Sequence, residues 1–216
     1  DGHCPPIPNW CCLKRIMPAE TTYCRRRTPL GDFLVLWAVH RGQPKIVRVL
    51  LSGPQSSTEM NFKAAVMTAR PSTCPEIEEI AAKMEAFLGG ADVSFSLDSV
   101  LLDLCSAFQQ QVLRAEHGIP RGQVSTYQLI ARFIGKPSAA RAVGSALANN
   151  PFPIIIPCHR AVRSDRTLGG FQGGLPMKKA LLEAEGIGFD SSGRVAVEDF
   201  FYSSTPIHTH TLANLS

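Results

Sequence analysis

The sequence lacks the features that mark membrane proteins, secreted proteins and proteins that coat DNA without specificity. No apolar run approaches the roughly 18 residues that a membrane-spanning helix needs. The seven cysteines are odd in number and form no repeated pair motif, which argues against a secreted disulfide framework and favours reduced thiols. The formal net charge of +4 at pH 7 permits contact with a polyanion, but charge alone identifies no partner.

The N-terminal segment also lacks the basic stretch, apolar core and cleavage site of a secretory signal. We therefore expect an intracellular protein, in the cytoplasm or the nucleus, with no membrane partner. What is present is an ordinary globular composition of 216 residues, of which 44% are hydrophobic and 19% are charged. This length allows one domain or two small ones, and either can bury a core without disulfides.

The first half of the sequence predicts an arm followed by a small domain. Residues 1–27 are rich in proline, cysteine and arginine without a strand or helix period, and we expect a loosely ordered arm. A first domain is expected over residues 28–100. Its apolar runs 33–39 and 46–51 flank a turn that contains glycine and proline, which predicts a β-hairpin. Apolar side chains at helical spacing predict an amphipathic helix over residues 75–88.

A second domain is expected over residues 101–190, with a tail over residues 191–216 that includes His208 and His210. Its expected helices lie at residues 104–114, 126–133, 138–148 and 176–185. Ser138 is the expected cap of the third helix. Because a glycine-containing break separates the second helix from the third, the pair has the signature of a helix-turn-helix.

Cys158 is the candidate nucleophile. It follows the apolar run 153–157, stands directly before His159 and precedes the glycine-rich residues 168–174, so a buried element meets an accessible loop here. The thiolate is the reactive form, and free cysteine, with a pKa of about 8.5, needs a base or a positive field to form it near neutral pH. We expect His159 to act through a turn or a bridging water, with Glu185 on the following helix orienting the imidazole.

The other cysteines have plainer interpretations. Cys105 has apolar neighbours at helical spacing and is expected in the core, whereas Cys74, beside Pro75, is expected to be a loop thiol. A zinc site is an open alternative for five N-terminal residues, although their spacings match no standard zinc pattern: His3, Cys4, Cys11, Cys12 and Cys24. We expect no metal and no cofactor.

Residues 150–160, Asn-Pro-Phe-Pro-Ile-Ile-Ile-Pro-Cys-His-Arg, closely resemble the signature of the O6-alkylguanine-DNA alkyltransferases. The likeness continues in order, without a large gap, through residues 108–109, 122–127, 141–144, 173–175 and 181–186. The hairpin opening at residues 28–31 is similar to the first domain of that family.

The resemblance implies a chemical role for each matching residue. Cys158 would accept the alkyl group, with His159, Glu185 and a water as its activating relay. Asn150 would shape the cysteine pocket. Tyr127 would contact the flipped guanine and its phosphate, and would donate a proton as the guanine leaves.

The resemblance also implies how DNA is held. Arg141 would enter the base stack in place of the extruded nucleotide, because alkyl transfer cannot occur inside a stacked duplex. Four positions match residues that touch the DNA backbone in the family: Gln109, Gln128, Lys136 and Ser164. The residues alone favour a core aromatic for Tyr127 and an ordinary surface side chain for Arg141, whereas the ordered match favours the DNA-binding roles. Phe171 stands where several members have tyrosine, so its loop is expected to rely on backbone and apolar contacts.

The fold that the resemblance implies is a two-domain α/β fold, with a small ribonuclease-H-like N-terminal domain and a helical, winged-helix-like (helix-turn-helix) C-terminal domain. The implied function is stoichiometric repair of O6-alkylguanine in double-stranded DNA by a monomer that works from the minor groove without turnover. Two alternatives stay open. A lesion-binding or regulatory helix-turn-helix protein would bind DNA without chemistry, but the lesion binders lack the acceptor cysteine. A cysteine hydrolase would use similar residues and would turn over.

Overall fold

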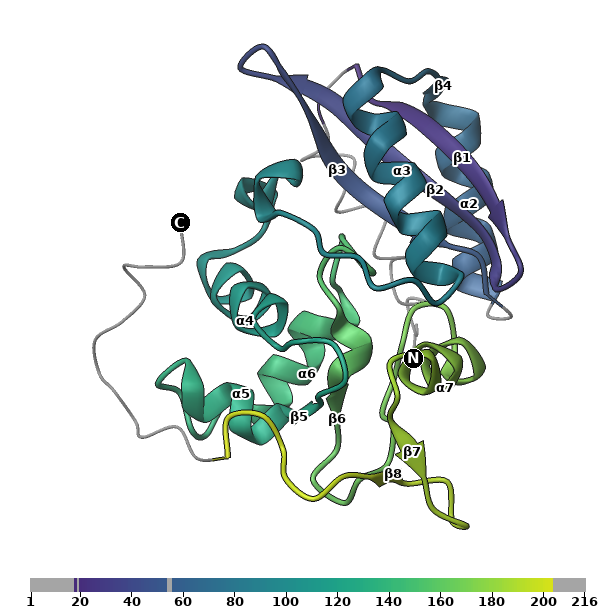
Figure 1. The fold of residues 1–216 in the computed structure, drawn as a ribbon. Coiled ribbons are helices and arrows are strands. Elements are labelled where there is room, and N and C mark those ends of the chain that lie inside the picture. The colour runs from purple at the N-terminus through teal and green to yellow at the C-terminus, as the bar shows by residue number, and fades with distance from the viewer. Residues whose placement is uncertain (1–17, 19, 54–55, 204–216) are drawn as a thin grey trace, which may run out of the picture.

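The computed structural model describes residues 18, 20–53 and 56–203, which form a mixed α/β fold. Figure 1 shows a sheet with two helices in the upper half and a mainly helical lower half. None of the helices in these described ranges is long and apolar enough to cross a membrane.

The upper half is built on a four-stranded sheet with the order β3-β2-β1-β4. Its strands are β1 (Thr22–Thr28), β2 (Gly31–His40), β3 (Gln43–Leu51) and β4 (Arg70–Pro71). β2 pairs antiparallel with β1 and with β3, and β4 pairs parallel to β1. The predicted hairpin is therefore confirmed. Arg41 and Gly42, with φ of 50° and 78°, form its two-residue turn.

Strand β1 corrects the expectation that the arm extends to residue 27. The strand pairs with β2 along its whole length, from Thr22 opposite Trp37 to Thr28 opposite Gly31. Cys24 is its one buried side chain, and the three arginines that follow hide the alternation of apolar and polar residues. Pairing with β2, rather than local sequence preference, makes this segment a strand.

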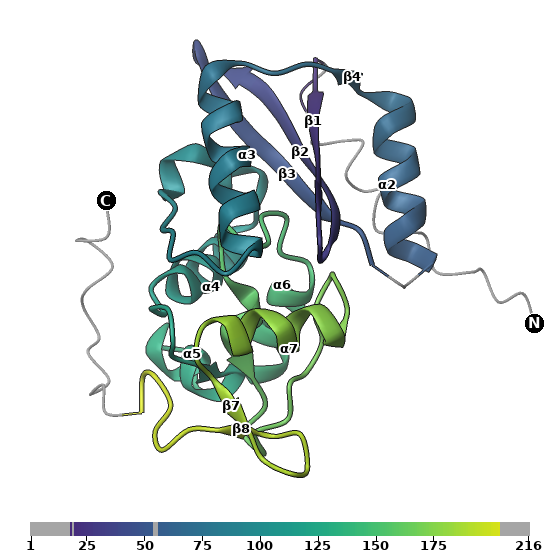
Figure 2. The same ribbon diagram turned by 45° about the vertical axis from the view of Figure 1, so that its right-hand side comes forward.

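Two helices cover opposite faces of the sheet, as Figure 2 shows. α3 (Pro75–Leu88), which the sequence predicts, buries Met84 on the face that bears Phe33. α2 (Ser56–Thr68) packs Ala65 on the other face. The sequence does not predict α2, because the apolar residues of this helix form no continuous stripe.

The lower half contains four helices, three 3-10 turns and four very short strands in the described chain. Its helices are α4 (Ala107–His117), α5 (Tyr127–Phe133), α6 (Ala140–Ala148) and α7 (Leu175–Ala184). Its short elements are 3-10 turns η1 (Leu97–Ser99), η2 (Leu102–Leu104) and η3 (Cys158–Arg160), and strands β5 (Ser125–Thr126), β6 (Ala161–Val162), β7 (Gly188–Phe189) and β8 (Val195–Ala196). The four predicted helices are present, with boundaries shifted by a few residues.

A serine or threonine hydroxyl group caps α4 and α5, but not α6. The hydroxyl groups of Ser106 and Thr126 accept hydrogen bonds from the first turns of α4 and α5. Ser138 does not cap α6, which begins at Ala140 behind a turn in which the amide of Ala139 donates to the carbonyl of Lys136. The turn satisfies the backbone there, so the predicted serine cap is wrong. α5 and α6 still form the predicted helix-turn-helix.

Residues 188–203, here called the C-terminal strap, correct the expectation of a tail after residue 190. The amide of Phe201 donates to the carbonyl of Val124 at 2.8 Å, and the Tyr202 hydroxyl donates to the carbonyl of Ala115 at 2.8 Å. The Tyr202 ring stacks on Phe133 with 4.0 Å between centroids. These contacts rest on scattered aromatic residues, which give no periodic signal. His208 and His210 lie outside the described residues.

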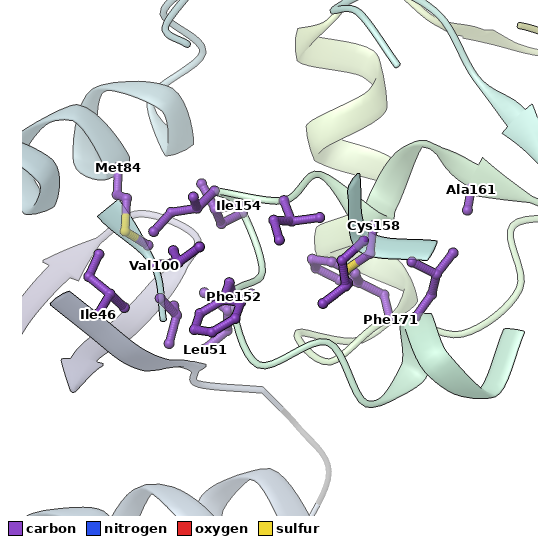
Figure 3. Packing of buried hydrophobic residues seen from close by; sticks show 14 of the residues in the cluster. Ile46, Leu51, Met84, Val100, Phe152, Ile154, Cys158, Ala161 and Phe171 are labelled. Carbon is purple, nitrogen blue, oxygen red and sulfur yellow. The ribbon is translucent and has the colours of Figure 1, made fainter. Parts of the chain in front are cut away.

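The edge of the sheet supports the loops that carry the candidate nucleophile. The amide of Val49 donates to the carbonyl of Pro151 at 2.7 Å, and the amide of Leu51 donates to Gln172 Oε1 at 2.9 Å. One hydrophobic core runs from the sheet through Phe152 to Cys158, as Figure 3 shows. The upper half therefore fixes the position of the cysteine segment.

Candidate active site

Cys158 begins the 3-10 turn η3 at the end of a tightly held loop. The Asn150 side chain closes this loop: its Nδ2 donates to the carbonyl of Ile156 at 3.0 Å, and its Oδ1 accepts from the amide of Phe152 at 2.9 Å. Inside the loop, Ile154 has a φ of 75°, which is a strained value for a β-branched residue. The Asn150 bonds and the packing of the loop on the sheet hold this strained conformation.

Cys158 is 7% exposed and lies among both apolar and charged groups. Burial raises its pKa to about 11, and a hydrogen bond involving Asn150 partly offsets this. Nearby Glu116 also raises the thiol pKa, whereas Lys178 lowers it. The resting thiol is therefore protonated, and any reaction of the thiolate needs a group that removes the proton.

His159 and Glu185 form the buried pair that the sequence predicts. His159 Nε2 lies 2.9 Å from Glu185 Oε1. Arg160 also donates hydrogen bonds to this carboxylate, from Nε to Oε2 at 2.9 Å and from Nη2 to Oε1 at 2.8 Å. Burial disfavours the carboxylate, but the bonds from His159 and Arg160 outweigh this and lower the pKa of Glu185 to about 2. Burial lowers the pKa of His159. The imidazole is thus neutral, with its Nε2 proton directed at Glu185.

The remaining nitrogen of His159 is placed to accept a proton. Nδ1 is buried and has no hydrogen-bond partner among the described residues. Phe87 and Phe171 meet the ring edge to face, with centroids 5.8 Å and 6.2 Å away. This packing fixes the plane of the imidazole and leaves Nδ1 as its one uncommitted polar atom within the part of the chain described.

A pocket of about 380 Å³ lies against the glycine-rich loop and is lined by residues that include Gly169, Gly170, Phe171 and Leu175. Tyr127 stands beside it: a Cβ at Gly169 would meet the Tyr127 hydroxyl at 2.5 Å, so only glycine fits there. Burial, with Glu116 and Cys158, raises the pKa of Tyr127 to about 12. Phe171 contributes apolar packing, as its lack of a hydroxyl predicts.

Apart from Tyr127, the five predicted DNA-binding residues fall into two groups. Arg141, Lys136 and Ser164 are exposed: Arg141 in the first turn of α6, Lys136 in the turn before it, and Ser164 after β6. Gln109 and Gln128 instead donate to protein carbonyls: Gln109 Nε2 to Asn149 at 3.0 Å and Gln128 Nε2 to Pro137 at 2.6 Å. The structure thus leaves three of these five side chains open to a partner and uses two to brace the helix-turn-helix.

Sequence reasoning missed three buried charged residues of the site. Glu116 and Lys178 are 0% exposed and Arg160 is 8% exposed. Glu116 follows Val112 and Leu113 on α4, so a charged residue on the apolar face of a helix is the signal that could have identified it. In the sequence, Arg160 stands out only as the last residue of the motif around Cys158.

The three other cysteines in the described ranges are not part of this site. Cys105 is buried in the core, as predicted, and Cys74 precedes the first residue of α3. Cys24 is buried in the sheet, and the other four residues of the alternative zinc site lie outside the described ranges. Within those ranges, no three histidine, cysteine or acidic side chains are grouped as metal ligands.

Comparison with known proteins identifies a family and several relatives that this chain resembles. Residues 107–187 match the family described as 6-O-methylguanine DNA methyltransferase, DNA binding domain. The methylated-DNA--protein-cysteine methyltransferase of Haemophilus influenzae is 35% identical over 159 residues, which cover 71% of this chain and 88% of the relative. The enzyme of the same name from Methanothermobacter thermautotrophicus is 42% identical over 114 residues, 53% of this chain and 64% of the relative.

A solved structure agrees with these relatives. The crystal structure of Mycobacterium tuberculosis OGT in complex with DNA is similar with a TM-score of 0.60 and 30% identity, covering 76% of this chain and 92% of that one. The mixed α/β fold is therefore shared with a protein that binds DNA. The chain belongs to the methylated-DNA--protein-cysteine methyltransferase family.

Proposed function

We propose that this chain reverses alkylation damage by moving an alkyl group from O6 of guanine in double-stranded DNA to its own Cys158. The observation that carries the proposal is the Cys158 thiol, held on a rigid turn beside the buried His159–Glu185 pair. The pocket at the glycine-rich loop is large enough for a flipped base. The names of the relatives support the same reaction.

The transfer itself is a displacement at the alkyl carbon. His159 Nδ1 takes the thiol proton through a bridging water, while Glu185 holds the Nε2 proton and stabilises the imidazolium. The thiolate sulfur forms a bond to the alkyl carbon as the bond from that carbon to O6 breaks, and the electron pair stays on guanine. Tyr127, whose raised pKa keeps its proton in place, donates to N3 of the leaving base.

The product explains why one protein molecule acts once. A thioether is a poor leaving group, so Cys158 is not regenerated and no cofactor is consumed. A cysteine hydrolase with the same residues would instead release its product and turn over. A purely lesion-binding protein would not need the acceptor thiol.

DNA is proposed to bind as duplex to the exposed side of α5 and α6. Arg141 would fill the space of the extruded nucleotide, and Lys136 and Ser164 would contact phosphates. Gln109 and Gln128 keep their proposed contacts to the DNA backbone, but each would first have to turn its Nε2 group away from the protein carbonyls that it faces, because only the N–H can donate to a phosphate oxygen. One monomer would bind one lesion, from the minor groove.

The finer description of the fold is also a proposal. The order β3-β2-β1-β4, with β4 parallel to β1, supports a ribonuclease-H-like first domain up to residue 100. The helix-turn-helix with short strands beside it supports a winged-helix-like second domain. The free thiols of the described cysteines and the DNA substrate support an intracellular location.

Intact-mass spectrometry tests the proposed function. The purified chain is incubated with an oligonucleotide duplex that contains O6-methylguanine, and peptides are then mapped. We expect one added methyl group, on the peptide that contains Cys158, and a plateau at one per active protein whatever the excess of DNA. Methyl groups on Cys74 or Cys105 at similar rates, or continued turnover, would contradict the proposal.

A further inference from the structure

The outer edge of strand β3 holds two loops of the lower half. β3 is the last strand on its side of the sheet, so alternate amide groups along it point away from β2. The amide of Val49 donates to the carbonyl of Pro151, in the loop that leads to Cys158, at 2.7 Å. The amide of Leu51 donates to Oε1 of Gln172, in the glycine-rich loop, at 2.9 Å. This second bond, here called the Gln172 tether, fixes the glycine-rich loop to the strand that also supports the acceptor loop.

A close backbone contact lies beside the tether. Gly53 follows β3, and a Cβ at this position would meet the carbonyl group of Gly173 at 3.3 Å, which is tighter than an ordinary contact. Because glycine has no Cβ, the two backbones can approach this closely. The glycine-rich loop therefore contacts the end of β3 both through the side chain of Gln172 and through its own backbone.

The wall of the pocket has little stiffness of its own. It belongs to residues 168–174, which include four glycines, and glycine leaves the backbone free to move unless other groups hold it. Lys178 holds the first part of this loop: its Nζ donates to the carbonyl of Gly170 at 3.3 Å and to the carbonyl of Ala161, after the cysteine turn, at 2.6 Å. The Gln172 tether holds the second part. The position of the wall therefore depends on these anchors.

We propose that Gln172 is a specificity-determining residue, because its tether to β3 fixes the pocket wall and so limits the size of the alkyl group that Cys158 can accept. Gln172 follows Phe171, which lines the pocket, but is not itself among the lining residues. It therefore acts by positioning the wall. While the tether is in place, a bulky substituent must displace a fixed wall. Without the tether, the glycines let the wall retreat, and bulky substituents gain relative to methyl.

The test compares two DNA duplexes that differ only in the size of the alkyl group, one with O6-methylguanine and one with O6-benzylguanine. Full-length wild type and variants, in excess over DNA, react with each duplex, and transfer to Cys158 is followed by mass spectrometry. The measured quantity is the ratio of the benzyl rate to the methyl rate. Both substrates need the same base flipping and the same thiolate, so damage to either step lowers both rates together and leaves the ratio unchanged.

Three substitutions separate the hydrogen bond from the bulk of the side chain. Gln172→Leu keeps the size but cannot accept a hydrogen bond, and Gln172→Ala removes both. Gln172→Glu keeps an oxygen that can accept from the amide of Leu51. Gln110→Leu is the matched control, since Gln110 is also half-buried and its side chain donates to the carbonyl of Cys105 at 3.0 Å, outside the pocket lining.

We expect the benzyl-to-methyl ratio to rise about tenfold in Gln172→Leu and Gln172→Ala, the discrimination that space for about one methylene provides in a pocket. Gln172→Glu, which keeps the acceptor, and the distant Gln110→Leu should stay within about twofold of the wild-type ratio. An unchanged or lower ratio in Gln172→Leu would overturn the proposal. An equal rise in Gln172→Glu would also overturn it, because the hydrogen bond would then not be the cause.

A second measurement needs no DNA. Iodoacetamide and its bulkier N-benzyl derivative alkylate Cys158 as the sulfur displaces iodide, and Cys74 in the same sample corrects for the reactivity of each reagent. The ratio of the bulky to the small reagent at Cys158 should also rise in Gln172→Leu.

This inference rests on the proposed function, since it assigns the pocket to the alkylated base, but the two can fail separately. A wild-type chain that takes no alkyl group from either duplex, while Gln172→Leu shows the raised iodoacetamide ratio, would refute the proposed function alone. A wild-type chain that accepts alkyl groups from DNA on Cys158, with both ratios unchanged in Gln172→Leu, would refute the role of the tether alone.

Discussion

The two halves of the molecule place their polar side chains in opposite ways. In the upper half the side chains classed as buried are apolar in the described residues, and charged groups such as Arg25 and Asp32 pair at the surface. The buried polar and charged side chains of the described chain all lie between residues 116 and 185: Glu116, Ser125, Thr126, Asn150, His159, Arg160, Lys178 and Glu185. Since burying such groups costs free energy, the lower half carries the chemistry and the upper half supplies rigid support.

The sharpest test of this division is Cys158→Ala, which should abolish alkyl transfer altogether. Binding to duplex DNA that contains O6-methylguanine should remain within a few-fold of wild type, because contacts with the DNA backbone, and not the thiol, supply the affinity. Mass spectrometry measures transfer, and fluorescence anisotropy with a labelled duplex measures binding. Residual methylation of the variant at the wild-type rate would remove Cys158 from the mechanism.

Arg141→Ala should separate base flipping from chemistry within the lower half. We expect repair of duplex DNA to slow by roughly 10- to 1,000-fold, equivalent to about 1.4 to 4 kcal/mol, because the variant cannot fill the gap in the stack. Reaction with free O6-benzylguanine, which is already unstacked, should stay within a few-fold of wild type. Equal losses on both substrates would point to damage of the fold. As a control, Lys136→Ala should weaken DNA binding and reduce its salt dependence.

Glu185→Gln should slow transfer by about tenfold or more at pH 7, because an amide cannot stabilise the imidazolium of His159 as a carboxylate does. Single-turnover measurements with excess protein report this rate. An unchanged rate would leave Glu185 with a structural role only.

The same variant gives a prediction about stability against pH. The folded-state pKa of Glu185, at about 2, is below its ordinary value of 4.5, so the carboxylate stabilises the fold above pH 4.5 and loses this effect as pH falls toward 2. Wild type should be the more stable protein at pH 7, and its advantage over Glu185→Gln should shrink between pH 4.5 and 2. Urea denaturation at a series of pH values measures this. A constant difference would contradict the assignment.

Ile77→Ala, in the upper half, should have the smallest effect on chemistry. Ile77 is 0% exposed on α3, and its truncation should lower the free energy of unfolding by about 2 to 5 kcal/mol. The rate of transfer per folded molecule should stay within about twofold of wild type at 25 °C. A large loss of transfer rate in fully folded protein would show that the upper half shapes the active site more than the division between the two halves implies.

The parts of this fold that the sequence predicts are those with local signals. The hairpin has two apolar runs around a turn, α3 has a helical period with acidic residues in its first turn, and Cys158 stands within a dense motif. The unpredicted parts depend on distant partners. β1 needs the pairing with β2, and Lys178 needs two carbonyls that are far from it in sequence. No local pattern records such contacts, so only the folded chain reveals them.

The C-terminal strap sets the limits of the smallest piece that could be transplanted into another protein. The family match ends at residue 187, yet the strap beyond it covers Phe133 at the end of α5 and binds the backbone just before Tyr127. Ser125 Oγ also donates to the carbonyl of Phe201 at 2.7 Å. A chimaera that ends at residue 187 would expose the Phe133 ring and lose the hydrogen bond from Phe201 to Val124. A lower half transferred to another protein must therefore extend to Ser203.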